Sequence, residues 1–182
     1  MKAASLTDRI GFKRFLLEWL FASGWRKNHP NAARTSPGKR VLIVDDDAVV
    51  RLVTSRVLQH KGYEVMTAAD CSEAIAAIGE RRPDIILLDL SFPADIASGG
   101  GISWDGLDLM FWLRRLKNAR GARFIIITNN GSQQCLESAL AAGVVGFFQK
   151  PINHERLVEL IDRQLKPGSG EVSRHLNSSL KI

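Results

Sequence analysis

Three carboxylates, one hydroxyl and one ammonium group stand at the ends of short apolar runs in this 182-residue sequence. Short apolar runs are typical of strands that are buried on both faces of a parallel sheet. Because the carboxyl ends of parallel strands meet at one edge of a sheet, where ligands and chemistry collect, we expect these groups to share a pocket. They belong to Asp45, Asp46, Asp89, Thr128 and Lys150.

Three carboxylates in one pocket need a compensating cation. Two carboxylates about 4 Å apart repel by about 4 kcal/mol at an effective dielectric constant near 20. Carboxylate oxygens with few neutral ligands suit a hard, octahedral ion that keeps its waters, which points to Mg²⁺. Phosphoryl transfer needs an in-line carboxylate, a metal and cationic donors that neutralise the equatorial oxygens, and this pocket would supply each of them.

Taken singly, each residue also has a structural explanation. Asp89 could cap the turn after its strand, Thr128 could be an ordinary strand residue, and Lys150 could be a solvated strand end. Asp47, the third acid of the first run, is predicted to begin a helix, where the macrodipole favours a carboxylate, rather than to bind a metal. The order of the residues along the chain favours one site over separate coincidences.

From residue 39 onward, strand patterns alternate with helix patterns five times. This alternation implies a parallel sheet covered on both faces by right-handed crossovers, so the sequence predicts an α/β fold with a doubly wound, five-stranded parallel sheet. In the first helix, Val49, Leu52, Val53 and Val57 are the apolar residues at helical spacing. The strands are predicted at residues 40–44, 63–68, 85–90, 124–128 and 144–149, and the helices at residues 48–60, 71–79, 107–116, 132–142 and 153–165.

This series of motifs resembles the receiver domain of two-component response regulators, over residues 39–166. The shared motifs are an acidic pair after the first strand, a lone Asp after the third, a Thr after the fourth and a Lys-Pro after the fifth. Pro93 and the Asp105-Gly106 pair also match. The resemblance implies a stand-alone receiver with the flavodoxin-like fold, which is a signalling protein and not an enzyme.

The resemblance assigns the acidic residues to phosphorylation and metal binding. Asp89 would be the phosphoacceptor. Asp45, Asp46 and Asp89, together with the backbone carbonyl of Ser91, would surround Mg²⁺ as the cofactor.

The remaining motifs would hold and read out the phosphoryl group. Thr128 and Lys150 would contact its oxygens, and the bond between Lys150 and Pro151 would be cis, a form that proline permits. Phe147 occupies the aromatic switch position. When Thr128 turns toward the phosphoryl oxygens, Phe147 can occupy the vacated space, which gives a packing switch with two states.

A receiver of this kind takes part in phosphorelay signalling. The resemblance implies that a histidine kinase or a histidine phosphotransferase donates the phosphoryl group. The surface of the fourth helix, the fifth strand and the fifth helix would then change its affinity for a downstream target protein. No direct DNA binding is expected.

Two other functions fit parts of the pattern. Residues 43–49 match the Asp-x-Asp-x-Val signature of haloacid-dehalogenase-like phosphatases, but those enzymes need a further strand with an acidic pair after the lysine, where this sequence continues with a helix and a polar stretch. The second alternative is an interaction module that keeps the receiver fold without using the phosphorylation. The complete acidic pocket argues against it.

Two features depart from the usual receiver pattern. Residues 94–104 form an insertion with three consecutive glycines beside the phosphorylation site, and it is either a lid over the site or a tolerated surface excursion. Thr128 is followed by Asn129, where receivers commonly have a small residue. The bulkier Asn129 would narrow the approach to Asp89.

The composition and the charge distribution limit what the rest of the chain can be. An apolar fraction of 45% and a charged fraction of 24% are ordinary for a soluble globular protein, so neither disorder nor a membrane class is indicated. Cys71 and Cys135 form no disulfide framework, which fits a cytoplasmic protein. Of the net charge of +6, residues 1–40 carry +7, which leaves −1 for residues 41–182.

The two ends of the chain are predicted to lie outside the receiver. Residues 1–38 are expected to form a basic, amphipathic helical arm with a linker, since the apolar residues of 12–22 are too few to span a bilayer. The arm would dock on an anionic membrane surface or an acidic partner, or pack on the receiver itself. Residues 167–182 are predicted to be a flexible polar tail.

Overall fold

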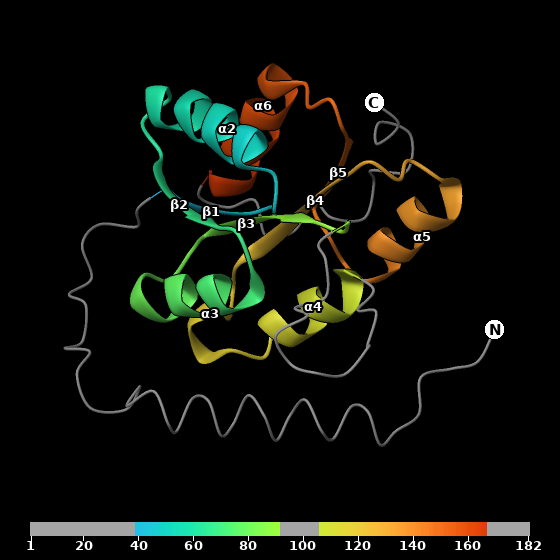
Figure 1. The fold of residues 1–182 in the computed structure, drawn as a ribbon, viewed down its shortest axis with the longest axis horizontal. Coiled ribbons are helices and arrows are strands. Elements are labelled where there is room, and N and C mark those ends of the chain that lie inside the picture. The colour runs from blue at the N-terminus through green and yellow to red at the C-terminus, as the bar shows by residue number, and fades with distance from the viewer. Residues whose placement is uncertain (1–38, 92–105, 167–182) are drawn as a thin grey trace. The chain divides into compact units, whose positions relative to one another are not determined.

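β3 (Ile85–Asp89) is the middle strand of a five-stranded parallel sheet, and all five of its residues are buried. The computed structural model describes residues 39–91 and 106–166, with elements labelled as in Figure 1. The other strands are β1 (Arg40–Val44), β2 (Glu64–Ala68), β4 (Arg123–Thr128) and β5 (Gly146–Gln149). Their order in the sheet is β2-β1-β3-β4-β5.

The register of the strands brings their carboxyl ends to one edge of the sheet. Val44 of β1 pairs with Leu88 of β3, and Thr128 of β4 pairs with Gln149 of β5. The next residue along three of these strands is charged, and these residues are Asp45, Asp89 and Lys150.

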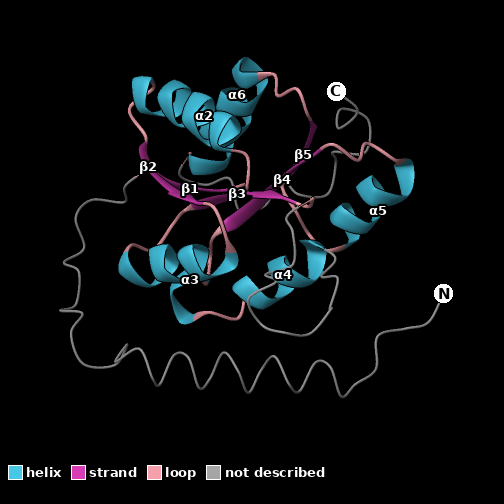
Figure 2. Ribbon diagram, in the orientation of Figure 1, coloured by secondary structure: helices cyan, strands magenta, loops and turns pink. Residues whose placement is uncertain are grey.

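Helices cover both faces of the sheet (Figure 2). α2 and α6 lie on one face, and α3, α4 and α5 lie on the other, so the predicted doubly wound α/β fold is confirmed. The helices are α2 (Ala48–His60), α3 (Cys71–Glu80), α4 (Gly106–Leu113), α5 (Gln133–Ala141) and α6 (His154–Leu165), with a short 3₁₀ helix, η2 (Lys117–Ala119), before β4.

The sheet separates two apolar layers because side chains alternate along each strand. In the layer under α2 and α6, Ile43, Leu87 and Ile125 pack with Leu58 and Leu157, all essentially inaccessible to solvent. The residues between them in each strand point to the opposite face, which the other three helices cover. Burial on both faces explains why the strands read as unbroken apolar runs.

α2 begins at Asp47, whose carboxylate accepts hydrogen bonds from the backbone N–H groups of Val49 and Val50. These two bonds satisfy donors that have no partner within the first turn of a helix. The predicted helix-starting role of Asp47 is confirmed. Three further helices begin at an N-cap side chain of the same kind, at Asp70, Ser132 and Asn153.

Three residues of the predicted apolar stripe of α2 face outward, whereas the fourth, Val57, packs against the core. Val49, Leu52 and Val53 are 66%, 59% and 44% exposed, although an apolar stripe at helical spacing normally faces the core. The buried residues of α2 are Thr54, Ser55 and Leu58.

α4 ends at Leu113, three residues before its predicted end, and is followed by a turn with i to i−3 hydrogen bonds. The side chain of Arg114 donates to the backbone oxygens of Ala142 and Gly143, at 2.6 Å each, and so ties α4 to the end of α5.

Two strands begin later than predicted. β2 begins one residue later. β5 begins two residues later, at Gly146, where its pairing with β4 starts.

Several predictions concern residues outside the described ranges. These are the arm at residues 1–38, the insertion at residues 94–104, the tail at residues 167–182, Pro93 and Asp105. Within residues 39–91 and 106–166, no helix combines the length and the apolar character needed to span a membrane.

Candidate functional site

The turn after β1 carries the first two acidic residues of the site. Asp45 is buried and Asp46 is exposed. The Asp45 N–H donates to the carbonyl of Ala68 in the neighbouring β2 at 3.2 Å, and its Oδ1 accepts from the Asp47 N–H at 3.0 Å. The backbone and one carboxylate oxygen of Asp45 are thus held by their surroundings, while Asp46 faces solvent.

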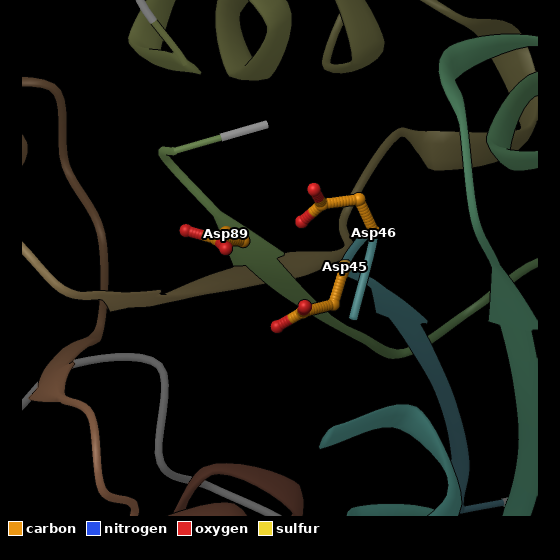
Figure 3. Close-up of side chains that lie close together, drawn as sticks. All are labelled: Asp45, Asp46 and Asp89. Atoms are coloured by element: carbon orange, nitrogen blue, oxygen red, sulfur yellow. The ribbon is translucent and has the colours of Figure 1, made fainter. Parts of the chain in front are cut away.

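Asp89 ends the middle strand and is also buried. Its Oδ1 accepts from the Ser91 N–H at 2.7 Å, and its Oδ2 accepts from the ammonium of Lys150 at 2.7 Å. Ligand oxygens of Asp45, Asp46 and Asp89 all lie within 4.8 Å of one another (Figure 3). The structure therefore brings together the three carboxylates that the sequence pattern predicted to meet.

Lys150 follows β5 and links two of these carboxylates. Its Nζ lies 2.8 Å from Oδ2 of Asp45 as well as 2.7 Å from Oδ2 of Asp89. Its backbone N–H donates to the Thr128 carbonyl at 2.9 Å, which continues the pairing of β4 and β5. The peptide bond between Lys150 and Pro151 is cis, as predicted.

The electrostatics of the pocket reflect buried acids with too little positive charge around them. Burial raises the pKa of Asp45, although the hydrogen bond from Lys150 works in the opposite direction. Burial alone would lower the pKa of Lys150, but its bonds to Asp45 and Asp89 outweigh that effect and raise the pKa. The partner of the buried Oδ2 of Asp45 is the ammonium of Lys150, 2.8 Å away.

Thr128 lies beside the acidic pocket at the end of β4, and its side chain is buried. Its Oγ1 accepts from the Asn130 N–H at 3.1 Å and lies 3.5 Å from Oγ of Ser91. Phe147 is buried in the neighbouring β5, where it pairs with Ile126 two residues before the end of β4. Thr128 therefore lies at the edge of the sheet that carries the site, whereas Phe147 lies further back along the neighbouring strand.

A cleft of about 540 Å³ opens over the carboxylates. Asp45, which is buried, is not among the residues that line it. Asn129, which the sequence singled out as bulky, does line the cleft and is exposed. The lining residues are Asp46, Asp47, Val50, Asp89, Ser91, Asn129, Lys150 and Pro151.

Two residues near the site were not predicted from the sequence. Val50 contributes an apolar side chain to the cleft. Arg51 donates from Nη1 to the backbone carbonyl of Asp45 at 2.6 Å. Only their position in the sequence could have indicated a role, because both residues fall in the first turns of the helix that follows the acidic pair.

Comparison with known proteins identifies the family. The sequence model of one protein family, the response regulator receiver domain, matches residues 41–162. The chain belongs to this family, the phosphorelay signalling domain of two-component systems.

The chain is similar to curated proteins of different lengths. It is 31% identical over 130 residues to the chemotaxis protein CheY of Thermotoga maritima, an alignment that covers 71% of this chain and 99% of CheY. It is also 31% identical over 126 residues to the nitrogen assimilation regulatory protein NtrX of Azorhizobium caulinodans. That alignment covers 69% of this chain but only 26% of NtrX.

Solved structures share the fold. Chemotaxis protein CheY4 of Vibrio cholerae has a TM-score of 0.60 at 30% identity, covering 70% of this chain and 99% of CheY4. A response regulator of Burkholderia pseudomallei, solved with a phosphorylated aspartic acid, a calcium ion and citrate, has a TM-score of 0.56 at 27% identity. It covers 74% of this chain and 70% of that chain.

Proposed function

We propose that this protein accepts a phosphoryl group on Asp89, with Mg²⁺ bound by the neighbouring acids, and thereby changes its affinity for a target protein. The observation that carries the proposal is the meeting of three carboxylates within 4.8 Å beside the ammonium of Lys150. A phosphorylated aspartic acid together with a divalent cation in the Burkholderia pseudomallei relative supports the same chemistry.

The residues present fit a magnesium ion. The ammonium of Lys150 lies 2.8 Å from Oδ2 of Asp45 and 2.7 Å from Oδ2 of Asp89, so a single positive charge faces three clustered carboxylates and a further cation would be attracted. Mg²⁺ prefers hard oxygen ligands and retains several waters, which the cleft over Asp46 and Asp89 can admit. We assign the ion to Asp45, Asp46, Asp89 and the backbone carbonyl of Ser91. When bound, it would neutralise charge on the phosphoryl oxygens.

The protein's own groups then account for the transfer. A carboxylate oxygen of Asp89 forms the new bond to phosphorus, while the bond from phosphorus to the donor's histidine nitrogen breaks and the nitrogen keeps the electron pair. Lys150 moves from the carboxylate to a phosphoryl oxygen, and the Thr128 hydroxyl donates to another. These two donors replace interactions that the oxygens had with water.

The donor is proposed to be a histidine kinase or a histidine phosphotransferase that docks on α2. A donor must bring its phosphohistidine into the cleft, so its contact surface must border the cleft. Val50 lines the cleft, and the exposed apolar residues Val49, Leu52 and Val53 surround it on the same helix. An apolar surface of this kind, with the acidic turn beside it, suits a protein partner.

The signal is proposed to leave through α5, β5 and α6. Thr128 and Phe147 would form the switch, because the Thr128 hydroxyl lies at the pocket and Phe147 lies in the neighbouring strand. Residues 39–166 are proposed as the receiver, with residues 1–38 and 167–182 as an arm and a tail. The target is taken to be a protein, without direct DNA binding, and the exchange to occur in the cytoplasm.

The proposal is tested by incubating the protein with acetyl phosphate, with Mg²⁺ or with EDTA, and measuring the intact mass. We expect one added phosphoryl group with Mg²⁺, and none with EDTA or in the Asp89→Asn variant. Equal labelling with and without Mg²⁺ would contradict the metal site. No labelling of wild type by acetyl phosphate or by any phosphorylated histidine donor would favour an interaction module that does not use the phosphorylation.

A further inference from the structure

Arg51 reaches back from α2 to the acidic turn. Its Nη1 donates to the backbone carbonyl of Asp45 at 2.6 Å, across six positions of sequence. The side chain is half-buried, and its own backbone N–H makes the first helical hydrogen bond, to the carbonyl of Asp47. Arg51 is thus anchored in the helix while its guanidinium holds the turn that precedes the helix.

The bond from Arg51 completes the restraint of Asp45. The N–H of Asp45 is held by Ala68, Oδ1 is held by the N–H of Asp47, and the carbonyl is held by Arg51. The remaining oxygen, Oδ2, faces the ammonium of Lys150 at 2.8 Å, on the side of the pocket where the positive charge lies. Asp45 is thus held at its N–H, its carbonyl and Oδ1, and these three bonds direct Oδ2 toward the positive charge in the pocket.

The same bond also orients Asp46. The carbonyl of Asp45 and the N–H of Asp46 belong to one planar peptide unit, so fixing the carbonyl direction fixes the plane from which the Asp46 side chain departs. Asp46 is exposed, so little packing from neighbouring side chains directs it. The backbone at Asp46 therefore sets the direction in which its side chain leaves the turn.

We propose that Arg51 is a positioning residue for the metal site, which holds the peptide between Asp45 and Asp46 so that both carboxylates face a bound Mg²⁺. The inference rests on the proposed function, because it assumes the ion. It adds a residue that touches neither the ion nor the phosphoryl group. Groups that orient metal ligands in this way typically change metal affinity by 10- to 100-fold when they are removed.

Two effects of Arg51 on Mg²⁺ binding have opposite signs, and this makes the inference testable. As a positive charge near the site, Arg51 repels a cation, so its removal would tighten binding. As a positioning residue it holds the ligands, so its removal would weaken binding. The hydrogen bond is direct, whereas the charge is half-exposed and screened, so we expect the positioning effect to dominate.

The experiment measures Mg²⁺ affinity by calorimetric titration in Arg51→Met, Arg51→Lys, Arg56→Met and Asp46→Asn. Arg56→Met is the matched control, since Arg56 is an exposed arginine on the same helix. We expect about tenfold weaker binding in Arg51→Met, a partial rescue in Arg51→Lys and no change in Arg56→Met. Hydrogen exchange of the Asp46 and Asp47 amides, measured without metal, should be faster in Arg51→Met only.

The outcomes separate the inference from the proposed function. If wild type binds Mg²⁺ no better than Asp46→Asn, the metal site is wrong and the inference falls with it. If wild type binds and Arg51→Met binds equally well or more tightly, the metal site is retained and the inference is overturned. If Arg51→Met does not fold, Arg51→Lys decides: unchanged affinity and unchanged amide exchange overturn the inference.

Discussion

The ammonium of Lys150 lies 2.7 Å from the carboxylate of Asp89 and 2.8 Å from that of Asp45. Lys150 follows β5, whereas Asp89 ends β3 and Asp45 follows β1, so one cation joins three strand ends. Asp45 and Asp89 are each 1% exposed, and their mutual repulsion is therefore little relieved by solvent. Lys150 supplies the positive charge that these buried carboxylates need.

Lys150→Met should lower the stability of the protein in buffer without metal. Removing one partner of a buried ion pair leaves an uncompensated charge and costs about 3 kcal/mol. Added Mg²⁺ should stabilise the variant more than wild type, because it replaces the missing cation. Thermal unfolding with and without Mg²⁺ measures both effects, and an equal Mg²⁺ response in the two proteins would contradict the role given to Lys150.

Asp46→Asn should weaken Mg²⁺ binding while leaving the fold intact. The side chain is exposed, so its loss creates no cavity. Removing one unit of charge about 4 Å from a divalent ion costs about 2 kcal/mol even at the dielectric constant of water, or roughly 30-fold in affinity. Calorimetric titration measures the affinity, and Glu80→Gln on α3 serves as a control that removes one exposed charge elsewhere.

Substitutions on the two faces of α2 should change the free energy of unfolding by very different amounts. Leu52→Ser changes a side chain that is 59% exposed and should alter the free energy of unfolding by no more than about 0.5 kcal/mol. Leu58→Ala empties a fully buried position and should cost about 2–5 kcal/mol. Urea unfolding compares the two variants, and a large loss in Leu52→Ser would mean that this face is covered in the free protein.

His154 should make the stability of the protein decrease in weak acid. Its Nε2 lies 3.3 Å from Oγ1 of Thr54, and burial lowers its pKa below the ordinary value of a histidine. The unfolded state then binds more protons than the folded state between the two pKa values, so stability is lost as the pH falls through this interval.

The measurement for His154 is the urea midpoint at about pH 8 and about pH 5.5, on either side of the ordinary histidine pKa. His154→Gln can keep a hydrogen bond to Thr54 and should show a smaller decrease than wild type. His60→Gln, at the exposed end of α2, serves as the control. An equal decrease in wild type and His154→Gln would show that another group causes the acid sensitivity.

Much of the fold and of the acidic pocket follows from the sequence for one physical reason. Strands buried on both faces read as apolar runs, and parallel strands place the residues after those runs at one edge. Asp45, Asp89 and Lys150 were therefore predicted to meet without any knowledge of the sheet order. The same argument predicted Thr128 at that edge.

Other features were not predictable because long side chains or tertiary packing produce them. The outward position of Val49, Leu52 and Val53 contradicts what helical spacing usually implies. Thr54 and Ser55 lie on the buried face of α2 together with Leu58. α4 ends early, at Leu113, and the next residue, Arg114, donates a hydrogen bond to the backbone oxygen of Ala142 at the end of α5. The contact of Arg51 with the Asp45 carbonyl depends on a rotamer, which a sequence pattern does not contain.

The central claim is that Asp89 carries the phosphoryl group, and chemical mapping tests it most directly. An acyl phosphate on aspartate is reduced by borohydride to homoserine, whereas a phosphate ester on serine or threonine is not. After treatment with acetyl phosphate and Mg²⁺, peptide mass spectrometry should find homoserine at position 89 in wild type and nowhere in Asp89→Asn. Homoserine at another aspartate in wild type, or an equal phosphoryl adduct in Asp89→Asn, would contradict the claim.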